Sequence, residues 1–263
     1  MRLIISNIMA IFRKELQGYF SSPFAYVVAA VFWLLSGFFF WTILNSIIQT
    51  VGLQDQSGLP APPVDVAYEF LRFFMNIMGS LVLFILPILS MGLYAEERKR
   101  GTLELLATSP ITNWAVAVGK LLGVLAFFTF MIMPLLAYEA ITLVAANPPI
   151  PPAIPLLAHG ALILLAASIL SLGMFVSSLT DSSILAAILT FGVILVLWLI
   201  ELIAKNIGGP VGEALGHLSL LDNYNNLVQG VLDTSSIIMF SSYIVLGVFL
   251  TAQSIDALRF QRS

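Results

Sequence analysis

Residues 81–104 read "LVLFILPILSMGLYAEERKRGTLE", an apolar run that ends in five consecutive charged side chains, Glu96 to Arg100. Such a block is unusual in a chain of 263 residues of which only 10% are charged and 59% are hydrophobic. The mean hydropathy is +1.01. Soluble domains are closer to half apolar and a quarter charged. This much apolar side chain cannot be buried in one soluble core, so we expect a membrane protein.

The apolar runs have the length of membrane-spanning helices, which need about 20 mostly apolar residues. Backbone groups in lipid must be hydrogen-bonded within the protein, which favours helices. The runs also lack the alternating pattern of outer-membrane barrel strands. We therefore predict an all-α membrane protein with six transmembrane helices, over residues 24–46, 71–93, 116–145, 155–179, 184–204 and 237–258.

Lysine and arginine positions predict the orientation, because cytoplasmic loops are enriched in both residues. If the N-terminus is cytoplasmic, only Arg72 and Lys205 of the 11 basic residues lie at the outer edge. The apolar run near the N-terminus is interrupted by charged residues, so we expect no signal peptide there. Both termini are then cytoplasmic, together with nine basic residues: Arg2, Arg13, Lys14, Arg98, Lys99, Arg100, Lys120, Arg259 and Arg262.

Two segments outside the predicted spans have helical patterns. Residues 2–20 place Ile4, Ile8, Ile11 and Leu16 at amphipathic helical spacing, which predicts an N-terminal interfacial helix, or only an anchor for the first span. Residues 205–236 hold two helical patterns of about 10 residues, each too short to span a bilayer. They favour either an outer re-entrant hairpin before the sixth span or an amphipathic loop on the headgroups.

The charged block lies in the inner loop between the second and third spans. The positive-inside rule accounts for Arg98–Arg100 but not for the two acidic residues before them. Gly101 permits a turn, and residues 102–109 fit about two helical turns before Pro110. Leu103 and Leu106 share one face of that helix. We interpret the loop as a docking surface rather than a topology signal alone.

Sequence motifs for catalysis are absent. The P-loop pattern, H-E-x-x-H and G-x-S-x-G do not occur, and the two histidines, His159 and His217, are isolated in the sequence. The chain has no cysteine, and its net charge of −3 does not indicate nucleic-acid binding. We expect no enzymatic activity and no cofactor or metal bound by this chain.

Two acidic residues, Glu139 and Glu201, lie nearest to the membrane interior. An intramembrane carboxylate is a functional candidate. Both residues are close to the ends of their spans, where Glu139 could reach the headgroups. They leave an alternative function open, a proton-coupled secondary transporter or channel that uses Glu139 and Glu201.

Three segments resemble one protein family. Residues 96–120, "EERKRGTLELLATSPITNWAVAVGK", resemble the conserved cytoplasmic loop of ABC-2-type exporter permeases. The likeness is to the branch with gliding-motility-associated and nitrous-oxide-reductase-maturation permeases. Residues 12–27, "FRKELQGYFSSPFAYV", and 218–244, "LSLLDNYNNLVQGVLDTSSIIMFSSYI", resemble the start of that branch and its segment before the last span. The resemblance implies one transmembrane domain over residues 1–263.

The resemblance also implies a function and partners. It implies a permease subunit of an ATP-driven exporter in the bacterial inner membrane, for an amphipathic, lipid-linked or polymeric substrate. A second permease copy or paralogue, membrane lipid and separate ATPase subunits, which hold ATP and Mg, are the implied partners. A membrane assembly factor without cargo is a further alternative. In this family the inner-loop helix is a coupling helix that docks on the ATPase.

The resemblance places particular residues in these roles. It implies that the outer hairpin caps the pathway, and the helical pattern there makes Leu221, Tyr224 and Leu227 candidate gate residues. The intramembrane carboxylates Glu139 and Glu201 are candidate pathway residues by their position in the spans. The candidate ATPase contacts are Glu96, Glu97, Arg98, Gly101, Thr102, Leu103, Glu104, Leu106, Arg13, Lys14 and Glu15.

Overall fold

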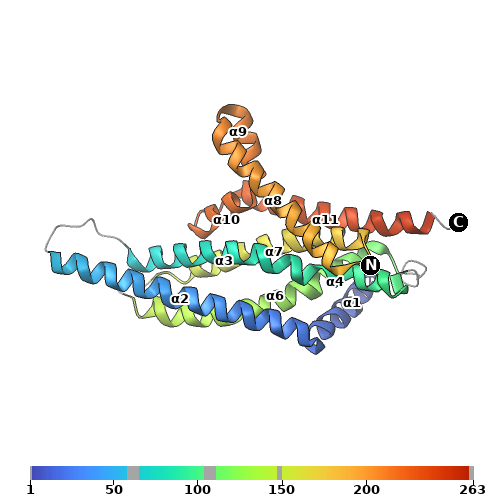
Figure 1. Ribbon diagram of the computed structural model, residues 1–263, viewed down its shortest axis with the longest axis horizontal. Helices are drawn as coiled ribbons and strands as arrows, with labels where there is room; N and C mark the ends of the chain where they lie inside the picture. Colours follow the sequence, from blue (N-terminus) through green and yellow to red (C-terminus); the bar gives the residue numbers. More distant parts are fainter. Residues whose placement is uncertain (1, 58–64, 104–110, 147–149, 261–263) are drawn as a thin grey trace.

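The computed structural model describes residues 2–57, 65–103, 111–146 and 150–260, and this part of the chain is helical without a strand (Figure 1). Most of the helices run along one long axis, whereas α1, α8, α9 and α10 are inclined to it. They are α1 (Arg2–Ser21), α2 (Pro23–Ser57), α3 (Val66–Ser90), α4 (Gly92–Lys99), α6 (Asn113–Val144), α7 (Ala153–Leu179), α8 (Ser183–Ile207), α9 (Gly209–Gly216), α10 (Leu220–Val228) and α11 (Thr234–Phe260).

Within the described residues, six segments are long and apolar enough to cross a membrane, which confirms the all-α fold with six candidate spans. Most helices extend beyond the predicted spans. The apolar run marks the thickness of the lipid, whereas a helix continues until a capping or breaking residue ends it. The segments are Pro23–Leu53, Val66–Lys99, Asn113–Val144, Ala153–Leu179, Ser183–Ala204 and Thr234–Ala257.

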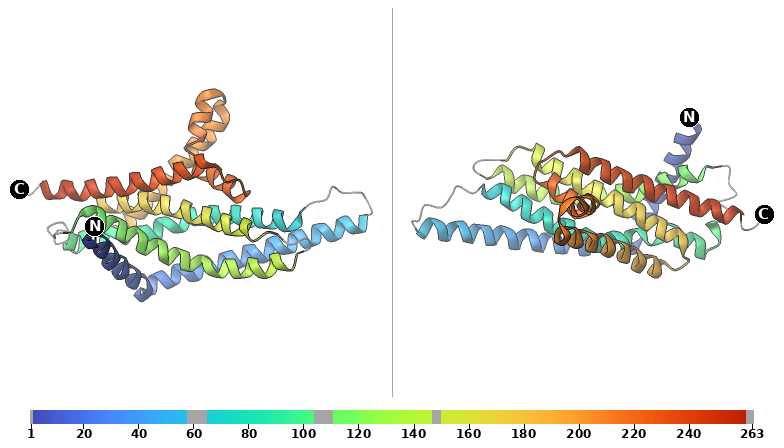
Figure 2. Two further views of the ribbon diagram at one scale, coloured as in Figure 1. Left: turned by 180° about the vertical axis from the view of Figure 1, so that it is seen from behind. Right: turned by 90° about the horizontal axis from the view of Figure 1, so that it is seen from above.

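Helix α7 forms the centre of the bundle (Figure 2). It packs against α3, α6 and α11, and 78% of its most apolar window is buried, against 17% for α8 and 22% for α2. Small residues permit this packing, since a Cβ at Gly247 of α11 would lie 2.5 Å from the carbonyl carbon of Ser171. Helices α2 and α8 direct apolar side chains outward, as expected of helices in contact with lipid or another subunit.

The second span is interrupted at Met91, where α3 ends and α4 begins. The hydroxyl of Ser177 on α7 accepts hydrogen bonds from the backbone N–H groups of Tyr94 and Ala95 at 3.1 and 3.0 Å. The same hydroxyl donates to the carbonyl of Met91 at 2.8 Å. One side chain therefore satisfies the backbone groups freed by the break, and it positions α4.

The two short helices predicted over residues 205–236 are present as α9 and α10. In Figures 1 and 2, α9 stands away from the bundle, whereas α10 lies against it. Helix α10 contacts α3 and α7, and Ser219 caps its start by accepting a hydrogen bond from the backbone N–H of Asp222 at 3.0 Å. The re-entrant arrangement of this pair stays a prediction.

Candidate functional site

Helices α1, α4 and α6 meet at the end of the bundle where both chain termini lie (Figure 1). The predicted N-terminal helix is present, and its apolar side packs on α6, with Ile11 and Leu16 partly buried. Two glycines of α6 permit close approach. A Cβ at Gly119 would lie 2.8 Å from the Cβ of Ile11, and one at Gly123 would lie 2.6 Å from the Cβ of Glu15.

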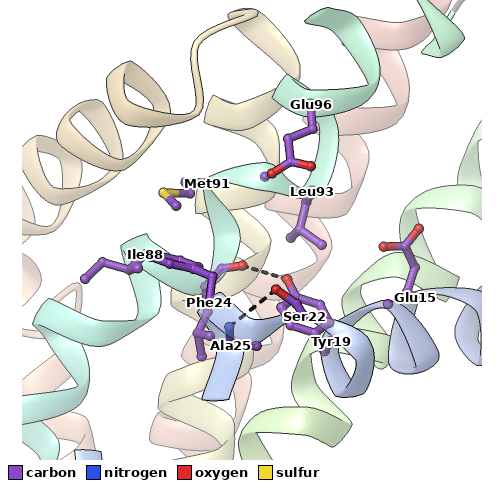
Figure 3. Close-up of a pocket in the computed structure, with 12 residues that line it drawn as sticks. Glu15, Tyr19, Ser22, Phe24, Ala25, Ile88, Met91, Leu93 and Glu96 are labelled. Carbon is purple, nitrogen blue, oxygen red and sulfur yellow. Dashed lines mark hydrogen bonds between the residues drawn. The ribbon is translucent and has the colours of Figure 1, made fainter. Parts of the chain in front are cut away.

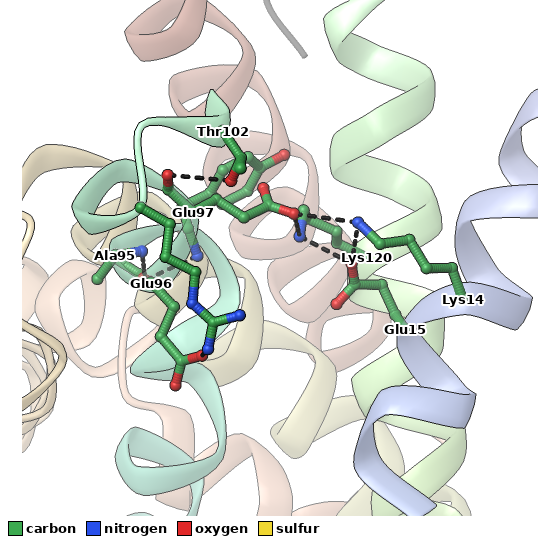
Figure 4. A network of polar contacts seen from close by, with 10 residues as sticks. Lys14, Glu15, Ala95, Glu96, Glu97, Thr102 and Lys120 are labelled. Carbon is green, nitrogen blue, oxygen red and sulfur yellow. Dashed lines mark hydrogen bonds and ion pairs between the residues drawn. The ribbon is translucent and has the colours of Figure 1, made fainter. Parts of the chain in front are cut away.

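A buried lysine joins these three helices. The ammonium of Lys120 on α6 lies 2.8 Å from Oε1 of Glu15 on α1 and 3.0 Å from Oε1 of Glu97 on α4. Lys14 on α1 lies 3.3 Å from the same oxygen of Glu97 and 3.9 Å from Glu15 (Figure 4). We call Lys14, Glu15, Glu97 and Lys120 the inner charge cluster. Its two cations and two carboxylates balance.

The members of the inner charge cluster differ in burial. The side chain of Lys120 is 3% exposed, whereas that of Lys14 is 69% exposed. The ammonium of Lys120 also lies 5.0 Å from the ring centroid of the buried Tyr94, which adds a cation–π contact. Removing one partner of a buried ion pair leaves an uncompensated charge, whereas an exposed pair contributes little. Lys120 is therefore the member on which the cluster depends.

A groove of about 600 Å³ lies between α1 and α4 and contains the inner charge cluster, together with Glu96 and Arg100. A second cavity of about 220 Å³ adjoins it (Figure 3). Tyr19 lines this cavity and donates a hydrogen bond to the carbonyl of Leu89 at 2.6 Å. Burial raises the pKa of Tyr19 well above its ordinary value, and the charges of Glu15 and Glu96 raise it further. Tyr19 therefore remains a donor that ties α1 to α3.

The charged block of the inner loop divides into exposed and structural residues. Glu96 and Arg100 form an ion pair of 3.4 Å one helical turn apart, with side chains 53% and 73% exposed. The guanidinium of Arg98 donates to the carbonyl of Ser178 at 2.8 Å, near the end of α7. Gly101, at φ +70°, ends α4 in the left-handed region. Arg98 therefore has a structural contact besides its expected role in topology.

Of the remaining predicted ATPase contacts, the structure describes Arg13, Thr102 and Leu103. Thr102 donates to the carbonyl of Glu97 at 3.2 Å, and Leu103 is 2% exposed, within the core rather than on a free apolar face. Arg13 is exposed on α1. Glu104 and Leu106 lie outside the described residues, so the predicted helix over residues 102–109 stays a prediction.

The predicted outer gate residues pack α10 onto the bundle. Tyr224 is fully buried and donates to the carbonyl of Met75 at 2.7 Å, with its ring over Gly79 of α3. Burial raises the pKa of the Tyr224 hydroxyl well above its ordinary value, and the charge of Glu139 raises it further. Leu227 is also buried, whereas Leu221 is partly buried. In this structure these side chains anchor α10.

The two intramembrane carboxylates have different partners. Glu201 on α8 accepts a hydrogen bond of 2.7 Å from the hydroxyl of Ser219, which links α8 to the start of α10. Glu139 is 1% exposed, so the expectation that it reaches the headgroups is wrong. Its Oε2 lies 3.6 Å from Nδ1 of His159 on α7, so two residues that are distant in the sequence lie together in the fold.

Sequence reasoning missed two of these contacts, although each left a signal. Lys120 served only to predict the topology. Its neighbours on the same helix face, Val116, Ala117 and Val124, are apolar, which indicates that the face is buried. Glu139 lies five residues before the end of α6, and His159 lies six residues after the start of α7. Antiparallel neighbours joined by a short loop bring such positions to the same depth.

Comparison with known proteins supplies one family. A sequence profile described as ABC-2 family transporter protein matches residues 9–263. The match includes all six candidate spans and the whole inner charge cluster. No curated protein matches the chain significantly.

Proposed function

The chain belongs to the ABC-2 transporter family, and from this premise we propose that it is the membrane subunit of an ATP-driven exporter. Separate ATPase subunits bind ATP and Mg, and this chain binds neither. Two copies, or this chain and a paralogue, form the pathway in a bacterial inner membrane, with both termini cytoplasmic. The resemblance noted in the sequence favours an amphipathic, lipid-linked or polymeric substrate.

The observation that carries this proposal is the inner charge cluster. Lys120 is held by carboxylates from two other helices, so a displacement of α1 or α4 acts on α6 as well. Helix α1 leads into the first span, α4 continues the second, and α6 is the third. A force applied at this end of the bundle therefore reaches three spans through one buried ammonium.

The exposed edge of the cluster supplies the contact with the ATPase in this mechanism. Glu96 and Arg100 are exposed beside the groove, whereas Leu103 is buried. ATP binding draws the two ATPases together, and their motion enters through α4 and the inner loop. The spans then open or close a path at the interface between the two permeases.

A charge exchange tests the docking surface without altering net charge. The double variant Glu96→Arg, Arg100→Glu is expected to weaken association with the partner ABC ATPase by about tenfold, or about 1.4 kcal/mol. The measurement is binding of the purified ATPase to the permease in nanodiscs. The matched control is Glu69→Arg, Arg72→Glu, which exchanges a partly exposed pair of α3 at the other end of the bundle. Unchanged binding in the first variant would overturn the docking assignment.

The buried pair of Glu139 and His159 is the observation that favours the proton-coupled alternative. A secondary transporter or channel would dissipate a pH gradient without ATP. Proteoliposomes that contain the chain alone and a pH-sensitive dye separate the two functions. We expect the gradient to decay at the rate of protein-free vesicles. Faster decay that Glu139→Gln abolishes would favour the alternative, and ATP-dependent transport would exclude an assembly factor without cargo.

A further inference from the structure

A carboxylate and an imidazole face each other between α6 and α7, inside the candidate membrane spans. Glu139 is 1% exposed and His159 is 3% exposed, and Oε2 lies 3.6 Å from Nδ1. We call these two residues the outer pair. Ionisable groups inside a membrane are costly, and they are a functional hypothesis by default. The proposed exporter mechanism assigns no role to either residue of the outer pair.

The hydrogen bonds of the imidazole define where its protons are. Nδ1 of His159 lies 3.0 Å from the carbonyl oxygen of Pro155. A carbonyl oxygen only accepts, so Nδ1 carries a hydrogen, and a second proton has to bind at Nε2. Within the described residues, Nε2 and both carboxyl oxygens of Glu139 have no hydrogen-bond partner. Three such buried polar atoms in one place require an explanation.

The surroundings do not supply a compensating charge. Within the described residues, no lysine or arginine forms an ion pair with either member of the outer pair. On α3, Glu69 and Arg72 pair with each other at 3.7 Å. On α10, the hydroxyl of Tyr224 donates to the carbonyl of Met75. The outer pair therefore has to balance its own charge.

Counting protons shows which states are compatible with this burial. Protonated Glu139 with neutral His159 has no net charge, and neither has the carboxylate with imidazolium. Loss of a proton leaves a net charge of −1, and gain of a proton leaves +1. A net buried charge costs several kcal/mol. We propose that Glu139 and His159 form a proton-binding site in the membrane, which retains one titratable proton, on the carboxyl group of Glu139 or on Nε2 of His159, while α6 and α7 are packed together.

Both side chains are almost completely buried, so proton exchange with water requires the packing around α6 and α7 to loosen. Hydration then allows either group to ionise by itself, because the cost of a net charge falls in water. Opening of this part of the bundle is therefore accompanied by proton exchange with the outer side. The site adds a dependence on external pH to the proposed exporter, and it does not depend on which ATPase docks.

The chain contains only two histidines, which makes the test direct. The full chain, labelled with ¹⁵N-histidine and reconstituted in nanodiscs, gives two imidazole spectra, and His217→Gln assigns them. Infrared spectroscopy reports protonated carboxyl groups, and the band lost in Glu139→Gln belongs to Glu139. We expect one proton on the pair at neutral pH, either on the carboxyl group or as imidazolium. Ionised Glu139 beside neutral His159, or both groups protonated, would overturn the proposal.

Matched variants separate the site from a general change in the fold. Glu201→Gln alters the other buried glutamate and is expected to leave the Glu139 band and the His159 spectrum unchanged. In Glu139→Gln, His159 is expected to be neutral at neutral pH, and imidazolium there would contradict the proposed proton-binding site. If Glu139→Gln does not fold, His159→Gln carries the test, with protonated Glu139 expected and a carboxylate overturning it. These measurements use no ATPase, so their failure leaves the proposed function intact.

Discussion

The inner charge cluster and the outer pair both bury ionisable side chains against α6, but they do so in opposite ways. At the inner end, Lys120 has two carboxylate partners within 3.0 Å, and the exposed Lys14 completes the balance. At the outer end, two groups 3.6 Å apart leave three polar atoms without hydrogen-bond partners among the described residues. The first arrangement suits a permanent connection between helices, whereas the second suits a group that changes its protonation.

The largest expected effect is at Lys120. Lys120→Met leaves Glu15 and Glu97 without their buried cation, and the loss is expected to be about 3–5 kcal/mol of unfolding free energy. Unfolding of the helical circular dichroism signal in mixed micelles measures it. Lys14→Met is the control and should cost less than about 1 kcal/mol, because its side chain is 69% exposed. Equal losses in the two variants would show that the cluster does not depend on the buried member.

The same amide substitution at both ends gives a smaller difference. Glu97→Gln removes a charge-assisted contact with Lys120 and is expected to cost about 2 kcal/mol. Glu139→Gln removes a carboxyl group that lacks hydrogen-bond partners within the described residues, and we expect a cost below about 1 kcal/mol. The same unfolding measurement compares them. If Glu139→Gln loses more unfolding free energy than Glu97→Gln, the outer pair, and not the inner charge cluster, is the stabilising connection between helices.

Salt is expected to have the smallest effect. Raising ionic strength screens the exposed contacts of Lys14, which should weaken the inner charge cluster by about 0.5 kcal/mol. The protonation state of the outer pair should not change, because both groups are buried. Unfolding measurements and the His159 spectrum, recorded at low and high salt, test the two parts separately. A salt-dependent His159 spectrum would show that water reaches the outer pair in this conformation.

The sequence was sufficient for the fold because lipid imposes simple rules. Length and apolarity identified six spans, and amphipathic spacing identified α1, α9 and α10. The candidate site was less accessible. The charged block drew notice to Glu97 and Arg98, but the partners Lys120 and Ser178 are distant in sequence and become neighbours only through helix packing. Leu103 shows the converse, since its spacing suggested a free face and packing buries it.

Ser177 has a mechanical consequence. Its hydroxyl bonds to three backbone groups of the second span, at Met91, Tyr94 and Ala95, so α4 is attached to α7 close to the point where α3 ends. A displacement of α4 therefore need not act on α3 alone. In the proposed exporter such a displacement also acts on α7, because Ser177 joins α4 to that helix.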